Sequence, residues 1–236
     1  MRTRKDLAII LPVYNPYFGW ERTLKVHLDG LRSLLCVQYV IVLVNDGSEV
    51  DVQKVVDELL IEYEELIYLG YKVNEGKGHA LRSGVAKVEA QYFILTDFDI
   101  PFGVSSIVQF SEELDHTESD ILLGKRSNAY FIDLPFRRRT LSKLFNYFTL
   151  PFLGFNHFDT QTGIKGFNQQ GKTVFLQTKT NSYVYDFEFV RLAVKRRLRI
   201  KNMEVNPIDG ITFSNFGSKT ILKELRSLFR ILIGGN

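Results

Sequence analysis

The stretch FILTDFDIPFG (93–103) leads from apolar residues directly into two aspartates, and it indicates how the chain folds. Its apolar part has the length and composition of a buried strand. Asp97 and Asp99 follow one residue apart, with Pro101 and Gly103 just behind them. The pattern therefore predicts a buried strand that delivers two carboxylates to a loop at its carboxyl end.

Apolar runs of the same kind alternate with amphipathic helical patterns along the first half. The expected strands are LAIILPV (7–13), YVIVLV (39–44), LIYLG (66–70), YFILTD (92–97) and DILLGK (120–125), and the expected helices between them include 20–35 and 51–65. Two-sided apolar strands separated by helices predict a mostly parallel α/β sheet that is covered on both faces. Farther along, we expect a strand near 163–168, a helix at 186–197, a strand at 198–205 and a last helix at about 218–233.

The overall composition fits one globular domain of 236 residues. The net charge of +3 gives no argument for nucleic-acid binding. Cys36 lies in the apolar run LLCV, so we expect a buried, inert thiol and a reducing compartment. The N-terminal stretch indicates a first strand rather than a signal peptide, and no run approaches the roughly 18–20 apolar residues that span a bilayer.

Polar residues gather where the expected strands end. They are Pro12, Tyr14 and Asn15 after the first strand, Asn45, Asp46, Gly47 and Ser48 after the second, NEGKGHA (74–80) after the third, and Asp97 and Asp99 after the fourth. In open α/β sheets, ligands bind outside the carboxyl ends of the strands. We therefore expect one edge of the sheet to form the site.

Asp97 and Asp99 are the candidate metal ligands. Two carboxylates this close repel each other unless a cation shares them. Mg²⁺ typically takes one or two protein carboxylates together with water and phosphate oxygens, and Mn²⁺ is a similar hard ion. The residues therefore favour Mg²⁺ or Mn²⁺ with a diphosphate, and a solvated acidic turn is the alternative.

The glycine-rich loop and the VNDGS segment (44–48) give weaker signals. The loop lacks the P-loop pattern, because Lys77 is followed by Gly78 rather than by Ser or Thr. It also lacks a third glycine for the dinucleotide fingerprint. A glycine turn that opens a helix remains, where Lys77 and backbone N–H groups either face an anion or simply start the helix. Asp46 either accepts from a nucleobase or ribose, or forms an ordinary turn and helix cap.

Taken in order, these segments resemble a known family. The carriers are ILPVYNP (10–16), VNDGS (44–48), NEGKGHALRSG (74–84) and LTDFDIPF (95–102), followed by DTQTGIKGF (159–167), YDFEFVRLAVKRRLRIKNMEV (185–205) and GSKTILKELRSLFRI (217–231). The chain is similar to the family-2 inverting glycosyltransferases of GT-A fold, especially the dolichyl- and polyprenyl-phosphate β-glucosyltransferase branch. The resemblance covers nearly the whole chain.

The resemblance implies a metal-dependent hexosyltransferase with a nucleotide-sugar donor, which we expect to be UDP-glucose. Pro12, Tyr14, Asn15 and Asp46 would hold the nucleoside, Lys77 and Gly78 would lie along the donor, and Asp97 and Asp99 would hold ribose and metal. The acceptor is expected to be a polyprenyl-phosphate type or a saccharide hydroxyl. The implied parts are a nucleotide-sugar-binding half at 1–125, an acceptor half at 126–217 and a C-terminal amphipathic helix at 218–236.

The acceptor decides which other residues matter. Asp186, which aligns with the family's catalytic aspartate, and Asp159 are the candidate general bases for a hydroxyl, and Asp99 joins them as a catalytic residue through the metal. An N-cap role is the alternative for Asp186. A phosphate acceptor would instead use cations, and the candidates are Arg126, Arg137, Arg138 and Arg139.

The last expected helix carries leucines on one side and Lys219, Lys223, Arg226 and Arg230 largely on the other. Such a helix either rests on an anionic membrane or docks on the core. We therefore expect a cytoplasmic protein, with peripheral contact to the inner face of the cytoplasmic membrane as an open alternative. A non-catalytic nucleotide-sugar-binding module and a nucleotidyltransferase are the alternatives of another class; the latter is disfavoured because PVYNPYFGW (12–20) is not a glycine-rich basic loop.

Overall fold

A computed structural model describes residues 5–127, 149–154, 158–208 and 218–233. Seven strands form one sheet in these ranges, in the order β3-β2-β1-β4-β6-β5-β7. They are β1 (Lys5–Val13), β2 (Tyr39–Asp46), β3 (Leu66–Tyr71), β4 (Ala90–Leu95), β5 (Ile121–Arg126), β6 (Lys165–Phe167) and β7 (Ile200–Val205). The neighbours pair in parallel except around β6, which runs antiparallel to both β4 and β5.

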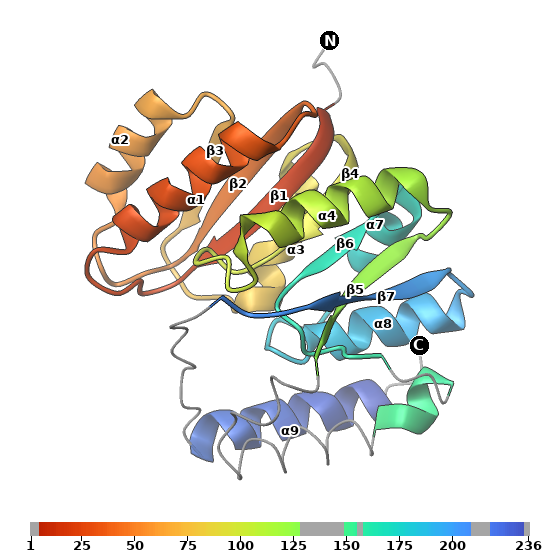
Figure 1. Ribbon diagram of the computed structural model, residues 1–236. Coiled ribbons are helices and arrows are strands. Elements are labelled where there is room, and N and C mark those ends of the chain that lie inside the picture. The colour runs from red at the N-terminus through yellow and green to blue at the C-terminus, as the bar shows by residue number, and fades with distance from the viewer. Residues whose placement is uncertain (1–4, 128–148, 155–157, 209–217, 234–236) are drawn as a thin grey trace.

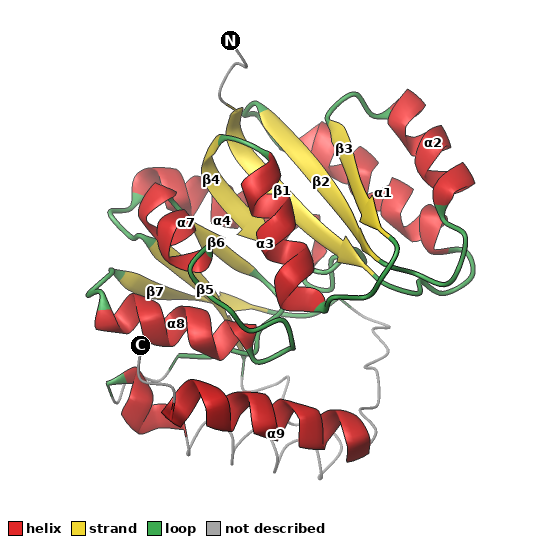
Figure 2. Ribbon diagram, turned by 180° about the vertical axis from the view of Figure 1, so that it is seen from behind, coloured by secondary structure: helices red, strands yellow, loops and turns green. Residues whose placement is uncertain are grey.

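Helices cover both faces of the sheet. They are α1 (Trp20–Leu34), α2 (Gln53–Glu62), α3 (Lys77–Lys87), α4 (Gly103–His116), α7 (Gln169–Phe175), α8 (Tyr185–Lys195) and α9 (Ser218–Ile233), with a short 3-10 helix η1 (Leu150–Leu153). Figure 1 shows α1 and α4 in front of the sheet, and Figure 2 shows α3, α7 and α8 on the opposite face. The prediction of a mostly parallel α/β sheet with both faces covered is confirmed.

The alternating side chains of the strands build two separate cores. Leu7, Ile9 and Leu11 of β1 point toward α1, α2 and α4 and belong to one apolar cluster. Ala8 and Ile10 belong to the other cluster, which lies with α3, α7, α8 and α9. Because successive residues of a strand face opposite sides, a strand covered by helices on both faces must be apolar throughout. This explains the uninterrupted runs in the sequence.

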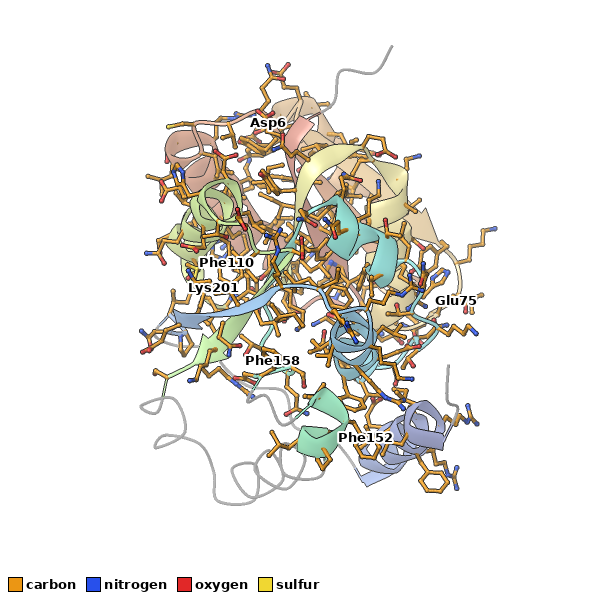
Figure 3. The ribbon with its side chains drawn as sticks, turned by 90° about the vertical axis from the view of Figure 1, so that its right-hand side faces the viewer. Asp6, Glu75, Phe110, Phe152, Phe158 and Lys201 are labelled. Atoms are coloured by element: carbon orange, nitrogen blue, oxygen red, sulfur yellow. The ribbon has the colours of Figure 1, made fainter. Side chains whose placement is uncertain are left out.

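The carboxyl ends of the parallel strands meet at one edge of the sheet, which we call the rim. Figure 3 shows Asp6, near the start of β1, at the top of the view, and Glu75, which follows β3, lower down on the right-hand side. Pro12 is buried inside β1, where it is aligned with Val44. The pairing of β1 with β4 ends earlier, at Ile10 and Leu95, so the missing N–H of Pro12 interrupts no ladder on that side.

The outer helix α9 docks on the core and also leaves a side exposed. Leu228 and Ile231 are buried in the core cluster that contains α8. Glu224 Oε2 accepts a hydrogen bond of 3.1 Å from the backbone N–H of Val184, directly before α8. Figure 3 shows η1, with Phe152, beside this helix. Arg226, Phe229 and Arg230 are exposed, which agrees with the predicted two-sided pattern.

Three expectations need correction or refinement. Cys36 is exposed rather than buried, because α1 ends at Leu34 and the apolar run continues into the turn before β2. The strand expected near 163–168 is shortened to β6. Helix α8 begins at Tyr185 with Val184 as its N-cap, so Asp186 lies inside the first turn and is not an N-cap.

Within the described ranges, no helix is both long enough and apolar enough to cross a membrane. The division into a donor half, an acceptor half and a terminal helix remains a prediction.

Candidate active site

Hydrogen bonds tie the loops at the rim to one another. The backbone N–H of Asn15, after β1, donates to Ser48 Oγ at 2.9 Å. Asn15 Oδ1 accepts from the N–H of Glu49 at 2.8 Å. Asn15 has a φ of 44°, a left-handed conformation that Asn tolerates better than most residues. Tyr14, next to it, is exposed at 47%. Asn15 therefore joins two loops, and Tyr14 leaves its ring open to a ligand.

Asp46 holds the loop after β3. Its Oδ1 accepts from the N–H of Glu75 at 2.9 Å, and its Oδ2 accepts from the N–H of Gly76 at 3.0 Å and from Asn74 Nδ2 at 2.9 Å. The residue is only 3% exposed. A carboxylate offers about four acceptor positions, so most of this capacity is already used within the chain. The predicted contact with a nucleoside remains a prediction, and the observed contacts give Asp46 a loop-fixing role.

Helix α3 begins at the glycine loop, as the glycine pattern indicated. Gly76 is its N-cap with a φ of 101°, a conformation that favours glycine. The N–H of Gly78 donates to the carbonyl oxygen of Asn181 at 2.8 Å. A Cβ on Gly78 would lie 2.3 Å from the carbonyl oxygen of Thr180. Gly78 thus allows α3 to pack against the 178–182 loop, and its N–H is not directed at an anion.

The 178–182 loop is itself fixed by two charged side chains that the sequence reasoning did not single out. Arg82 of α3 donates to the carbonyl oxygen of Thr180 at 2.8 Å. Glu188 of α8 accepts from the N–H groups of Lys179 at 3.0 Å and Thr180 at 2.7 Å. These contacts join the two expected halves of the chain beside the rim.

Lys77 and Asp97 form an ion pair at the rim, with Nζ and Oδ1 2.5 Å apart. Asp99 lies two residues further along. Burial and the negative charge of Asp97 raise the pKa of Asp99 above its usual range. Burial lowers the pKa of His27 on α1, although a hydrogen bond to the backbone of Asp99 opposes this. A neutral imidazole therefore supports the loop that carries the two aspartates.

Asp97 and Asp99 fit a divalent cation whose remaining coordination positions are filled by other ligands. Asp97 and Asp99 are both partly exposed, and Asp99 is destabilised as an anion by its neighbour. Among the described residues, no group of three or more His, Cys, Asp or Glu side chains gathers as a closed metal site. Two partly exposed carboxylates, of which Asp97 is paired with Lys77, match Mg²⁺ or Mn²⁺, which usually keep water and phosphate oxygens as their other ligands.

Asp186 faces the same region from α8. Its Oδ1 lies 2.9 Å from Lys165 Nζ, and its side chain is 14% exposed. Burial raises the pKa of Asp186, while the charges of Lys165 and Lys77 act in the opposite direction. Lys77 interacts electrostatically with both Asp97 and Asp186. The structure thus brings the predicted donor-side and acceptor-side carboxylates near one lysine.

Arg126 and Asp159 form a bidentate ion pair. Asp159 Oδ1 accepts from Arg126 Nη2 at 2.7 Å, and Oδ2 accepts from Nε at 2.7 Å. Burial alone would raise the pKa of Asp159, but the hydrogen bonds and charge of Arg126 hold it below its usual range. Asp159 therefore suits an anchor for Arg126 better than a proton acceptor. Arg137, Arg138 and Arg139 lie outside the described residues.

Tyr183 and Lys165 are further site residues that the sequence reasoning missed. Tyr183 is 49% exposed, and it interacts electrostatically with Lys77, Asp97 and Glu224. The sequence did offer a signal for Lys165, because it is a charged residue within the otherwise uncharged segment GIKGF (163–167). For Tyr183, residues 177–184 offered no comparable signal.

Comparisons with known proteins support the sequence resemblance. Residues 8–174 match the family model "Glycosyl transferase family 2". Similar proteins include the dolichyl-phosphate beta-glucosyltransferases of Saccharomyces cerevisiae and Dictyostelium discoideum. The first is 24% identical, over 86% of this chain and 68% of that protein; the second is 25% identical, over 97% and 75%.

A solved structure shares the fold. Glucosyl-3-phosphoglycerate synthase from Mycobacterium tuberculosis, in complex with Mn²⁺, UDP-glucose and glycerol 3-phosphate, superposes with a TM-score of 0.63. It is 14% identical, with 98% of this chain and 79% of that chain covered. A second structure of the same synthase is also 14% identical, with 98% of this chain and 80% of that chain covered, and its TM-score is 0.65. At this level of identity the likeness concerns the GT-A fold alone.

Proposed function

The chain belongs to glycosyl transferase family 2, and from that premise we propose that it moves a hexose from a nucleotide sugar to a polyprenyl-phosphate-type acceptor with inversion. The observation that carries the proposal is that charged side chains from two parts of the chain lie close together. Asp97, Asp99 and Lys77 come from the donor-side rim, and Asp186 comes from α8. This arrangement supports the proposal, because a sugar diphosphate and its metal ion need charges of both signs close together.

We propose UDP-glucose as the donor. The similar curated proteins are named as glucosyltransferases, and the structural neighbour binds UDP-glucose with Mn²⁺. Tyr14, Asn15 and Asp46 stand at the rim where the nucleoside would bind. Because the Asp46 carboxylate already accepts hydrogen bonds from Asn74, Glu75 and Gly76, its contribution would be to hold the 74–76 loop in shape around the nucleotide.

Asp97 and Asp99 would hold Mg²⁺ or Mn²⁺ together with the diphosphate. When bound, the ion would stabilise the negative charge that accumulates on the departing nucleoside diphosphate. Lys77 would contribute a second positive charge from the start of α3. Its ammonium group already neutralises Asp97 in the structure, so it lies within reach of the same position.

The reaction itself needs an oxygen nucleophile on the opposite side of the sugar. That oxygen forms a bond with the anomeric carbon while the bond from this carbon to the diphosphate oxygen breaks. The bonding electrons leave with the nucleoside diphosphate. A phosphate monoester with a second pKa of about 6 is largely ionised at neutral pH, so a lipid phosphate has little need of a base. Arg126 and the arginines at 137–139 would attract such an acceptor.

A saccharide hydroxyl is the second candidate acceptor, and one observation favours it. Burial raises the pKa of Asp186, which suits a group that removes a proton. In this reaction the hydroxyl proton would pass to Asp186 as the new carbon–oxygen bond forms. The two candidates therefore differ in whether Asp186 receives a proton during transfer.

A membrane surface is the proposed location of the phosphate acceptor. The exposed side of α9 presents Arg226 and Arg230 together with Phe229, which is 64% exposed. Cationic side chains next to an aromatic ring suit an anionic membrane surface. Glu224 of the same helix contacts Val184 next to α8. Docking through α9 would thus bring the active site close to lipid headgroups.

Assays with radiolabelled UDP-glucose, Mn²⁺ and either polyprenyl phosphate or oligosaccharides test the proposal. We expect transfer to the phosphate and a small effect of Asp186→Asn in that reaction. For a hydroxyl acceptor, Asp186→Asn should lower turnover by about a hundredfold or more. Pyrophosphate release from a nucleoside triphosphate and a sugar phosphate, or binding of the nucleotide sugar with no transfer to any acceptor, would contradict the proposal.

A further inference from the structure

Lys165 occupies an unusual place for a lysine. It begins β6, the antiparallel strand between β4 and β5, and is aligned with Leu95 on one side and Leu123 on the other. The residue is 1% exposed. A lysine is almost never fully buried unless its charge is paired. The two contacts of its ammonium group therefore need an explanation.

The ammonium group of Lys165 has two contacts, one with the loop before β6 and one with α8. Lys165 Nζ donates to the carbonyl oxygen of Thr162 at 2.6 Å. It also lies 2.9 Å from Asp186 Oδ1. The second contact is an ion pair, and Asp186 Oδ1 is itself inaccessible to solvent. The 14% exposure of the Asp186 side chain therefore belongs to its other atoms.

The other charged and titratable groups around this pair come from four elements. Lys77 of α3 acts on both members, Tyr185 of α8 hydrogen bonds to Asp186, Asp159 before β6 acts on Lys165, and Asp97 after β4 acts on Tyr185. Burial lowers the pKa of Lys165, and Asp186 opposes this. Burial raises the pKa of Asp186, and Lys165 is the first of the charges that oppose it.

We propose that Lys165 is a positioning residue for the transfer reaction: it keeps Asp186 ionised and holds Oδ1 inward, so that the rest of the carboxylate faces the acceptor. The inference rests on the proposed function with the saccharide hydroxyl as acceptor, because Asp186 receives a proton only in that reaction. Lys165 touches no substrate in this account and acts through Asp186. Without its charge, the buried carboxyl group would take up a proton more readily.

Lys172 is a matched control for burial. It is also a buried lysine, at 8% exposure, and its Nζ contacts the carbonyl oxygen of Val88 at 3.3 Å and Glu89 Oε2 at 3.0 Å. Glu89, unlike Asp186, has a side chain that is 74% exposed. Replacing Lys172 therefore removes a buried cation of similar surroundings without leaving a buried carboxylate unpaired.

The first test compares the rates of transfer to a saccharide hydroxyl for Lys165→Met, Asp186→Asn and the double variant across a range of pH. We expect Lys165→Met to slow transfer by about the same factor as Asp186→Asn and to recover as the pH rises. Asp186→Asn should show no such recovery, and the double variant should be no slower than Asp186→Asn. Lys172→Met should keep the wild-type pH profile. The proposal is overturned if the rate losses of the two single variants multiply in the double variant. It is also overturned if Lys165→Met keeps the wild-type pH profile.

The second test needs no activity, so it separates this proposal from the proposed function. Infrared difference spectra at neutral pH should show a protonated carboxyl band in Lys165→Met that disappears in the double variant. Loss of one member of a buried pair should lower the Tm by about 6–20 °C, and the double variant should regain much of this loss. If the band is absent and the single and double variants lose the same Tm, the proposed role of Lys165 toward Asp186 is contradicted. If Lys165→Met does not fold, folding of the double variant supports the proposal and its failure to fold opposes it.

Discussion

Lys77 Nζ lies 2.5 Å from Asp97 Oδ1, so an ion pair joins the start of α3 to the loop after β4. The side chains are 22% and 37% exposed, respectively, which leaves the pair accessible from the rim. The lysine therefore lies where a divalent cation would also approach Asp97. A metal ion and Lys77 would compete for one carboxylate, whereas a diphosphate would attract both.

This competition predicts opposite effects of Lys77→Met on two binding reactions. Mn²⁺ alone should bind more tightly, because Asp97 is no longer paired. UDP-glucose with Mn²⁺ should bind about tenfold more weakly or worse, because a hydrogen bond to a charged group contributes about 1.5–3 kcal/mol. Titration calorimetry measures both. Lys87→Met, at the exposed end of α3, is the control, and a parallel change in both affinities would refute the competition.

Asp46→Asn should release the 74–76 loop. An amide NH₂ group cannot accept from the N–H groups of Glu75 and Gly76, and it would face one of them as a second donor. We expect faster hydrogen exchange at these two amides and a loss of unfolding free energy of about 1–3 kcal/mol. Asp51→Asn is the control, because Asp51 is exposed and caps Gln53 through one oxygen. Unchanged hydrogen exchange at residues 74–76 would contradict the loop-fixing role of Asp46.

The Arg126–Asp159 pair predicts a loss of stability in acid. Burial opposes ionisation, but Arg126 outweighs it and holds the pKa of Asp159 below its usual range. A carboxyl group whose pKa is lowered in the folded state stabilises the protein above its unfolded pKa of about 3.9 and loses this effect as the pH falls through the folded value. The Tm should therefore fall below about pH 4. Asp159→Asn should have a lower Tm at neutral pH and a shallower acid decline; an equally steep decline would contradict the assignment.

The exposed side of α9 predicts binding to anionic vesicles. The protein should sediment with phosphatidylglycerol vesicles and not with phosphatidylcholine vesicles, and high salt should release it. Reversing the charge at Arg226 and Arg230 together should weaken binding by about 2 kcal/mol or more, at about 1 kcal/mol for each basic residue lost. Lys54→Glu on α2 is the control, because Lys54 is equally exposed but lies on a distant helix (Figure 1). Equal losses in both variants would indicate a non-specific charge effect.

The sheet and its rim could be predicted from the sequence because their causes are local. The apolar runs of β1 and β2 are long and two-sided, and Asp97 follows its strand directly. Cys36 shows the limit of the same reasoning. A thiol within an apolar run is exposed because the run crosses the end of a helix, and run composition alone does not locate that end.

The contacts between distant segments could not be predicted in this way. Lys165 reaches Asp186 only because a three-residue strand is inserted antiparallel into a parallel sheet. Gly78 meets the carbonyl oxygen of Asn181 across about a hundred residues of sequence. The periodic pattern of apolar residues does not indicate such pairings, since they depend on the order of the strands in the sheet. From the sequence we therefore expect Gly78 to lie beside an anion, whereas the fold shows its close packing against the 178–182 loop.

The central claim is that Asp97 and Asp99 bind a metal ion that holds the diphosphate of the donor. A crystal soaked with UDP-glucose and Mn²⁺ tests it most directly, because manganese gives its own anomalous signal. The account predicts an anomalous peak within bonding distance, about 2.0–2.3 Å, of at least one of these carboxylates and of the diphosphate oxygens, with Lys77 turned toward the diphosphate. A peak and a diphosphate bound elsewhere on the chain, with Asp97 still paired to Lys77, would contradict it.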